Sequence, residues 1–410
     1  MSLTQTPLDL QPDSMAPHYV DDDELQILLE HDHEEREADR LALPGFLIAT
    51  SVGAVMLAVI AIVTAVFALA GRSDEPTATS AAAGTAAAAA GTGAAVQPGT
   101  TAAPTIAQAK GVKFEPYQRP DPALPAVPAG TVKRFRVTVD EHVSQVSAAL
   151  APTQVWTYGV NGTSYPGTGG SPPLVVDQGD SVEITLANTG TLGMKVVMPH
   201  SIDFHSAEVA PNIDYTDIGP GATKKFSFVA KHPGVYMYHC ATQPILMHAG
   251  SGMTGMMVVR PKGLPAADEY WLTQQEFFIG KPGGMADLAK IKAKNPDVVA
   301  FNGFADQYKT HPITVQRGKR IRMYVLNGGV STWSAFHVIG TVFDRTMVEG
   351  TAGRHSQTIN LAPSQGGWVD FTLDKEGNYP FVTHAFGDMV KGATGVLHTT
   401  GGPIPKGSGH

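Results

Sequence analysis

The C-terminal two thirds of the chain alternate between apolar and polar residues over short runs. The run 181–186 places Val182, Ile184 and Leu186 on one face, with polar side chains between them. This period-two pattern is typical of a half-buried strand, and Gly-Asp, Pro-Gly and Asn-Gly pairs between such runs are typical of turns. The pattern predicts an all-β body that holds one helix, at 285–294.

The strand pattern occurs twice, about 140 residues apart. The segments 175–190 and 314–329 align without gaps, VVDQGDSVEITLANTG against TVQRGKRIRMYVLNGG. Upstream of them, YGVNG at 158–162 matches AFNG at 300–303. A repeat of this length indicates two copies of one domain.

We therefore expect two tandem Greek-key β-sandwich domains, at 131–262 and 263–402. The composition agrees, because 44 glycines, 30 prolines and only 16% charged residues favour many turns over helical bundles.

Three segments precede this body. Residues 1–40 carry twelve acidic residues against two arginines, and we expect a disordered acidic tail. Residues 41–71 contain no charge and are long enough to form a single transmembrane helix. The helix is either retained as an anchor or removed as a signal peptide. Residues 72–130 are rich in Ala, Thr, Gly and Pro and predict a linker, with a flexible tether without packed contacts over 73–110.

Charge and cysteine content exclude some classes of protein. The formal net charge is -8; the acidic tail alone carries -10, the other residues sum to +2, and no basic patch is present. We therefore expect no nucleic-acid partner. The single cysteine, Cys240, excludes an intramolecular disulfide.

That cysteine lies among residues that suit a soft metal. A blue-copper centre takes two imidazoles, one thiolate and a weak thioether. His200, Cys240, His248 and Met253 supply these four groups, the last three within one short interval of the chain. The alternative is a buried thiol among core residues.

A second set of histidines remains. His239 precedes Cys240, and His205 follows His200 by five residues, so each pair points to opposite faces of an extended strand. His384 lies in KEGNYPFVTHA, the repeat counterpart of HPGVYMYHCA around Cys240. Three imidazoles with an open fourth position are typical of a catalytic metal.

Several motifs together resemble those of copper-containing nitrite reductases. They are HSIDFHSA, GVYMYHCA with the later histidine and SGMTG, FHVIG, and VTHAFGDMVKGATG, and the resemblance covers residues 131–400 approximately. It implies two cupredoxin domains in each chain, a homotrimer, and two coppers per chain.

The resemblance also implies roles for single residues. The set His200, Cys240, His248 and Met253 matches the ligands of the type 1 copper. His205 and His239 match two ligands of the type 2 copper, and His384 matches the third, which a neighbouring chain supplies. Asp203 and His337 match the catalytic aspartate and histidine, and Ile339 matches the apolar residue of the substrate pocket.

The implied activity is the one-electron reduction of nitrite to nitric oxide, with a small redox protein, a cupredoxin or a cytochrome c, as donor. The body would lie on the extracytoplasmic side of the cell membrane, anchored by residues 41–71. Two alternatives stay open: a laccase-like two-domain multicopper oxidase, and an electron carrier with a type 1 copper alone. The oxidase needs His-x-His pairs, and the folded body has none.

Overall fold

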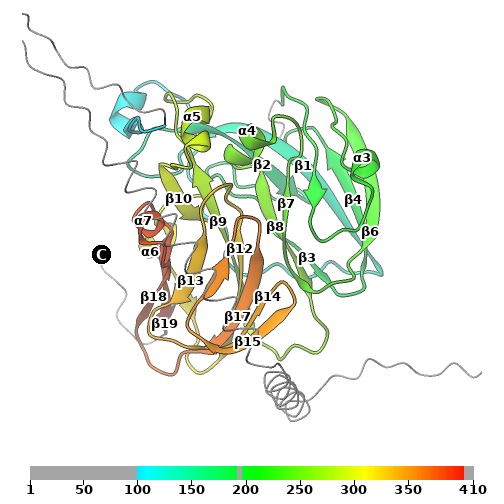
Figure 1. Cartoon of the computed structure of the whole chain (residues 1–410), viewed down its shortest axis with the longest axis vertical. Helices are drawn as coiled ribbons and strands as arrows, with labels where there is room; N and C mark the ends of the chain where they lie inside the picture. Colours follow the sequence, from blue (N-terminus) through cyan, green and yellow to red (C-terminus); the bar gives the residue numbers. More distant parts are fainter. Residues whose placement is uncertain (1–98, 192–195, 401–410) are drawn as a thin grey trace, which may run out of the picture. The chain divides into compact units, whose positions relative to one another are not determined.

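A computed structural model describes residues 99–191 and 196–400 (Figure 1). Within these ranges, no helix is both long enough and apolar enough to cross a membrane. The predicted acidic tail, the predicted membrane span and the first part of the linker lie outside the described residues.

The described body consists mainly of strands in four sheets, as the alternation predicts. The first two sheets have the orders β2-β1-β4-β6 and β3-β8-β7-β5. Their strands are β1 (Val132–Ser144), β2 (Thr153–Val160), β3 (Leu174–Asp177), β4 (Ser181–Ala187), β5 (Asp203–Phe204), β6 (Thr223–Val229), β7 (Gly234–His239) and β8 (Thr254–Arg260).

The other two sheets have the orders β10-β9-β12-β17-β14-β15 and β11-β19-β18-β13-β16. Their strands are β9 (Asp268–Phe277), β10 (Val298–Phe301), β11 (His311–Val315), β12 (Arg320–Asn327), β13 (Ser334–Val338), β14 (Phe343–Val348), β15 (Thr351–Ser356), β16 (Ile359–Leu361), β17 (Gly366–Thr372), β18 (Asn378–Thr383) and β19 (Thr394–Thr399).

The sequence repeat is visible in the strand pairing. β4 pairs in parallel with β1 and antiparallel with β6, and β12 pairs in the same way with β9 and β17. In the facing sheets, β3 runs parallel to β8 as β11 runs parallel to β19. The second copy has three additional strands: β14 and β15 extend one sheet beyond β17, and β16 extends the other sheet beyond β13.

Each pair of sheets encloses its own core. Val182, Ile184 and Leu186 of β4 are buried with side chains from the facing sheet, among them Tyr238 and Met257. The corresponding residues of β12 lie in a second, separate core: Ile321, Met323 and Val325. Two β-sandwiches result, because alternate side chains of each strand enter the space between its two sheets.

A third apolar cluster joins the two sandwiches. Val235 of β7 and Met256 of β8 pack with Trp271 of β9, Tyr324 of β12 and Trp368 of β17. All five are buried, so the β3-β8-β7-β5 sheet has apolar partners on both faces. The two sandwiches therefore meet through this sheet and the sheet that contains β9 and β12 (Figure 1).

The helices are short. They are η1 (Ile106–Ala109), α3 (Pro211–Asp214), α4 (Ile245–Gly250), α5 (Leu288–Lys292), α6 (Gln307–Thr310) and α7 (Phe386–Met389). The helix predicted at 285–294 is present as the shorter α5, but the prediction that the body holds one helix is wrong, because it also holds α3, α4, α6 and α7. Helix α5 begins after Asp287, whose carboxylate accepts hydrogen bonds from the Ala289 and Lys290 amides.

The prediction of a tether without packed contacts is wrong for its last part, because residues 99–110 already contact the body. The Gly99 carbonyl accepts a hydrogen bond from the Asn295 side chain at 2.9 Å, and the Ile106 amide donates to Ala149. Farther along the linker, the Trp271 amide donates to Pro122. Composition does not reveal these contacts, because they use backbone groups that every residue type carries.

One buried imidazole makes the stability of the body depend on pH. Burial lowers the pKa of His142 to about 4, while an unfolded chain takes up this proton near 6.5. The free energy of unfolding therefore decreases as the pH falls from about 6.5 to about 4, by about 3 kcal/mol in total from this residue.

We expect His142→Gln to flatten the pH dependence of the unfolding free energy over this interval. Denaturant unfolding of the metal-free protein at a series of pH values measures it, because bound metal would add its own pH dependence. The control is His232→Gln, which changes an exposed imidazole and should retain the wild-type slope. Equal slopes for His142→Gln and wild type would contradict the prediction.

Candidate metal centres

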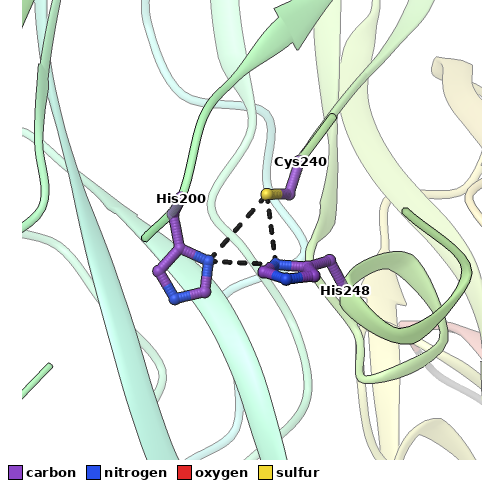
Figure 2. A group of neighbouring side chains, drawn as sticks. All are labelled: His200, Cys240 and His248. Atoms are coloured by element: carbon purple, nitrogen blue, oxygen red, sulfur yellow. Dashed lines mark hydrogen bonds between the residues drawn. The ribbon is translucent and has the colours of Figure 1, made fainter. Parts of the chain in front are cut away.

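Three side chains from separate elements converge inside the first sandwich (Figure 2). Cys240 follows the last residue of β7, His248 lies in α4, and His200 lies at a bridge with Ile218. All three are at most 1% exposed. The predicted thiolate and imidazole ligands therefore lie together in a water-poor site.

The spacing of their donor atoms suits a single ion. Cys240 Sγ lies 3.3 Å from His248 Nδ1 and 3.9 Å from His200 Nδ1, and the two Nδ1 atoms are 3.2 Å apart. Ligand atoms that lie about 2.0–2.3 Å from one ion in a trigonal plane are separated by roughly 3.5–3.8 Å. The triangle has nearly this size, so the residues present fit a bound metal.

The local electrostatics favour a thiolate. Burial alone would raise the pKa of Cys240, but contacts with His200 and His248 outweigh it and lower the pKa to about 5. The Ser201 amide also donates a hydrogen bond to Cys240 Sγ, at 3.5 Å. Since the thiolate is the metal-binding form of cysteine, the site is prepared for a soft cation.

Met253, the predicted thioether ligand, is joined to this group through its backbone. Its carbonyl accepts a hydrogen bond from the Cys240 amide, and its amide donates to the His248 carbonyl, both at 3.2 Å. The side chain is fully buried in the same core. The interval from Cys240 to Met253 contains helix α4, which carries His248.

Two neighbours of the buried group were not predicted from the sequence. Glu141 of β1 accepts a hydrogen bond from His200 Nε2 at 3.0 Å, and the indole of Trp156 packs 4.8 Å from the His248 ring. Burial alone would raise the pKa of Glu141, but hydrogen bonds from His200 and two backbone amides lower it. Glu141 and Trp156 come together only through the strand register, in which Glu141 of β1 lies opposite Trp156 of β2.

A second group lies on the other side of β7. Asp203, His205 and His239 place their ligand atoms within 4.8 Å of one another. The Nε2 atoms of the two histidines are 3.1 Å apart, and His239 Nδ1 contacts the Cys240 carbonyl at 2.9 Å. Donation of the Nδ1 proton to that carbonyl leaves Nε2 of His239 free to bind a metal.

The strand pairing explains how this group forms. β5 pairs with β7 so that Asp203 lies opposite His239, which brings the two histidine-bearing segments together. Burial, together with the neighbouring His239, lowers the pKa of His205. The imidazole of His205 is therefore neutral near pH 7, as metal binding requires.

The remaining predicted residues lie in the second sandwich. The rings of His337 in β13 and His384 after β18 stack with centroids 5.2 Å apart, and His337 Nδ1 contacts the Gln357 carbonyl. Burial lowers the pKa of His337, while Ile339 is 44% exposed. Among the described residues of one chain, His384 belongs to neither group of metal-binding side chains.

A hollow opens beside the second group. A pocket of about 360 Å³ is lined by His205 and His239 together with apolar side chains that include Met237, Ile245 and Val330. The two imidazoles therefore border a space that a small molecule can enter.

Known proteins with this sequence pattern bind copper. The multicopper oxidase family matches residues 137–263. A copper-containing nitrite reductase of Neisseria gonorrhoeae is 37% identical over 243 residues, which cover 56% of this chain and 61% of the relative. Another, of Alcaligenes xylosoxydans xylosoxydans, is 30% identical over 261 residues, which cover 62% of this chain and 74% of the relative. The chain belongs to the copper-containing nitrite reductase family.

Solved structures agree with this membership. The copper nitrite reductase from Nitrosomonas europaea superposes with a TM-score of 0.59 at 28% identity, over 68% of this chain and 98% of that one. A multicopper oxidase at 22% identity and a TM-score of 0.53, over 66% of this chain and 88% of that one, shares the fold. The match to the Neisseria gonorrhoeae nitrite reductase spans 61% of that protein's length.

Proposed function

We propose that the chain is a copper-dependent nitrite reductase that forms nitric oxide, NO₂⁻ + e⁻ + 2H⁺ → NO + H₂O. The observation that carries the proposal is the peptide bond between His239 and Cys240, which links two groups of metal-binding side chains on opposite sides of β7. An electron carrier with one copper has no use for the second group.

The buried group would hold the type 1 copper. His200, Cys240 and His248 would hold it through two imidazoles and a thiolate, and Met253 would add a weaker thioether ligand. Their burial keeps water from the metal, which suits a group that only accepts and passes on an electron.

The second group would hold the type 2 copper, giving two coppers per chain. His205 and His239 supply two imidazoles, and His384 of the partner subunit supplies the third. A head-to-tail ring of chains brings the first sandwich of one subunit against the second sandwich of the next. The absence of His384 from the group within the described part of one chain supports this arrangement, and we propose a homotrimer.

Bound copper would supply the electron and act as a Lewis acid toward nitrite. The chain itself must supply protons. Asp203 Oδ2 lies 4.0 Å from His239 Nε2, so that Asp203 in its protonated form would reach an oxygen of the substrate beside that nitrogen and donate a hydrogen bond to it. His337, whose pKa is lowered by burial, would relay the second proton as a neutral imidazole, and Ile339 would form the apolar wall of the nitrite pocket.

The alternative of a laccase-like oxidase has less support. Its three-copper cluster needs His-x-His pairs, and residues 131–402 contain none. Family members of similar sequence carry the name nitrite reductase, whereas the multicopper oxidase cited above is less than 25% identical.

We also propose that the protein is anchored in the cell membrane by residues 41–71, with the body on the extracytoplasmic side and a small redox protein as donor. The absence of charge over 41–71 supports the anchor. Mass spectrometry of the membrane fraction tests it: a mature N-terminus near Gly71 would show cleavage instead.

The activity has a direct test. Copper-loaded protein with nitrite and an artificial reductant, kept free of oxygen, should release nitric oxide at an electrode. The copper-free protein is the control. Consumption of oxygen with an organic reductant, and no nitric oxide from nitrite, would favour the oxidase alternative.

The two copper sites should be separable by substitution. Cys240→Ala removes the thiolate, so we expect loss of the visible thiolate-to-copper absorption while the second copper stays bound. His205→Ala should keep this colour and lose nitrite reduction. Absorption spectra and metal analysis measure both, and loss of the same spectral feature in both variants would contradict the two-site assignment.

Subunit complementation tests the ring. His205→Ala and His384→Ala chains should each be inactive, whereas co-assembled mixtures should regain activity, because one kind of interface joins an intact His205 to an intact His384. Random mixing leaves about a quarter of the interfaces intact. Full activity and full occupancy of the second copper in an isolated monomer would contradict the shared site.

A further inference from the structure

A carboxylate reaches the far side of one ligand of the buried group. His200 presents Nδ1 to Cys240 and His248, and its other nitrogen, Nε2, contacts Glu141 Oε1 at 3.0 Å. Both side chains are nearly inaccessible, at 0% for His200 and 4% for Glu141. The carboxylate therefore lies close to the metal site without touching it.

The carboxylate is itself firmly held. The same Oε1 atom accepts hydrogen bonds from the Val197 amide at 3.1 Å and the Met198 amide at 3.0 Å. These residues lie three and two positions before His200, so one oxygen fixes both the ring and the segment that carries it. Glu141 is part of β1, which is paired on both sides in its sheet, so the acceptor is positioned by the sandwich and not by a loop.

We propose that Glu141 is a positioning residue for the type 1 copper and keeps its reduction potential low. This inference rests on the proposed assignment of the buried group as a type 1 site, and does not depend on nitrite reduction. Glu141 accepts a hydrogen bond from the N–H at Nε2 of His200. This fixes the tautomer in which Nδ1 carries the lone pair that faces the metal.

The negative charge acts on the metal as well as on the ring. A buried anion interacts more strongly with Cu(II) than with Cu(I), because the oxidised ion carries the greater positive charge and the surrounding protein screens poorly. The hydrogen-bonded carboxylate also makes the imidazole a stronger electron donor. Both effects favour the oxidised state, so the protein would pass its electron onward more readily.

The substitution Glu141→Gln separates charge from architecture. The amide oxygen of glutamine can accept the same three hydrogen bonds, while the charge is lost. We expect the ratio of reduced to oxidised type 1 copper, at a fixed ambient potential, to rise at least about tenfold, which is about 59 mV for a one-electron couple. Spectroelectrochemical titration of the thiolate-to-copper absorption measures this ratio.

A second variant tests the positioning role. Glu141→Ala removes the acceptor as well as the charge, so the His200 ring loses its fixed orientation. We expect copper retention against a chelator to weaken by about 10–100-fold, as is usual when an outer partner of a metal-binding histidine is removed. Unfolding of the copper-free variant, followed by circular dichroism, shows whether the sandwich itself is intact.

The matched control is Glu183→Gln. Glu183 belongs to β4 of the same sheet and pairs with Arg134, with a side chain that is 34% exposed. Arg134 lies roughly 23 Å from Glu141 along β1, at about 3.3 Å per residue. This variant loses the same charge from the sheet and should keep the wild-type potential.

The outcomes distinguish the role of Glu141 from the assignment of the buried group as a type 1 copper site. A Glu141→Gln protein with the wild-type potential, or a control that shifts as far as Glu141→Gln, would overturn the role of Glu141 and leave the copper site standing. A wild-type protein without any thiolate-to-copper absorption would overturn the type 1 assignment and Glu141 with it. Neither result depends on whether nitrite is reduced.

Discussion

The alternation of side chains along the end of β7 is the constraint on which both metal groups depend. Cys240 turns into the core of the first sandwich, while His239 turns to the opposite side and meets His205. Because neighbouring residues of an extended strand cannot share a face, one peptide unit separates the buried candidate metal group from the accessible one. The apolar contacts of β7 with the second sandwich hold this strand in place and so keep both groups in register.

The two copies of the internal repeat differ at the position of the buried cysteine. Thr383 of β18 occupies the place that Cys240 has after β7, six residues beyond the matching glycine, and its hydroxyl contacts the Ala335 and Ala385 amides. This hydroxyl stabilises the backbone after β18 but, unlike a thiolate, is not a soft metal ligand. The imidazole of the second sandwich comes one residue later, at His384, which is exposed and lies outside the core that holds Cys240 in the first sandwich.

Much of this architecture could be predicted from the sequence because it depends on local periodicity. The faces of β4 and β12, the opposite orientations of His239 and Cys240, and the grouping of His200 with Cys240 all follow from the period of a strand and from residue chemistry. Glu141 could not be found in this way, because it lies 59 residues before His200 and meets it only through the order of strands in the sheet. The contacts of residues 99–110 were missed for a related reason, since backbone carbonyls leave no mark in composition.

The segment from Gly99 to Val132 has a mechanical consequence. It begins beside Asn295 in the second half of the chain, contacts Ala149 near Ile106, and returns to pair with Trp271 before it enters β1. Any pull transmitted from upstream would load these hydrogen bonds before it reached β1, the strand that carries Glu141. The segment would thus take up part of such a force before it reached the sheet that holds Glu141 beside the buried candidate metal group.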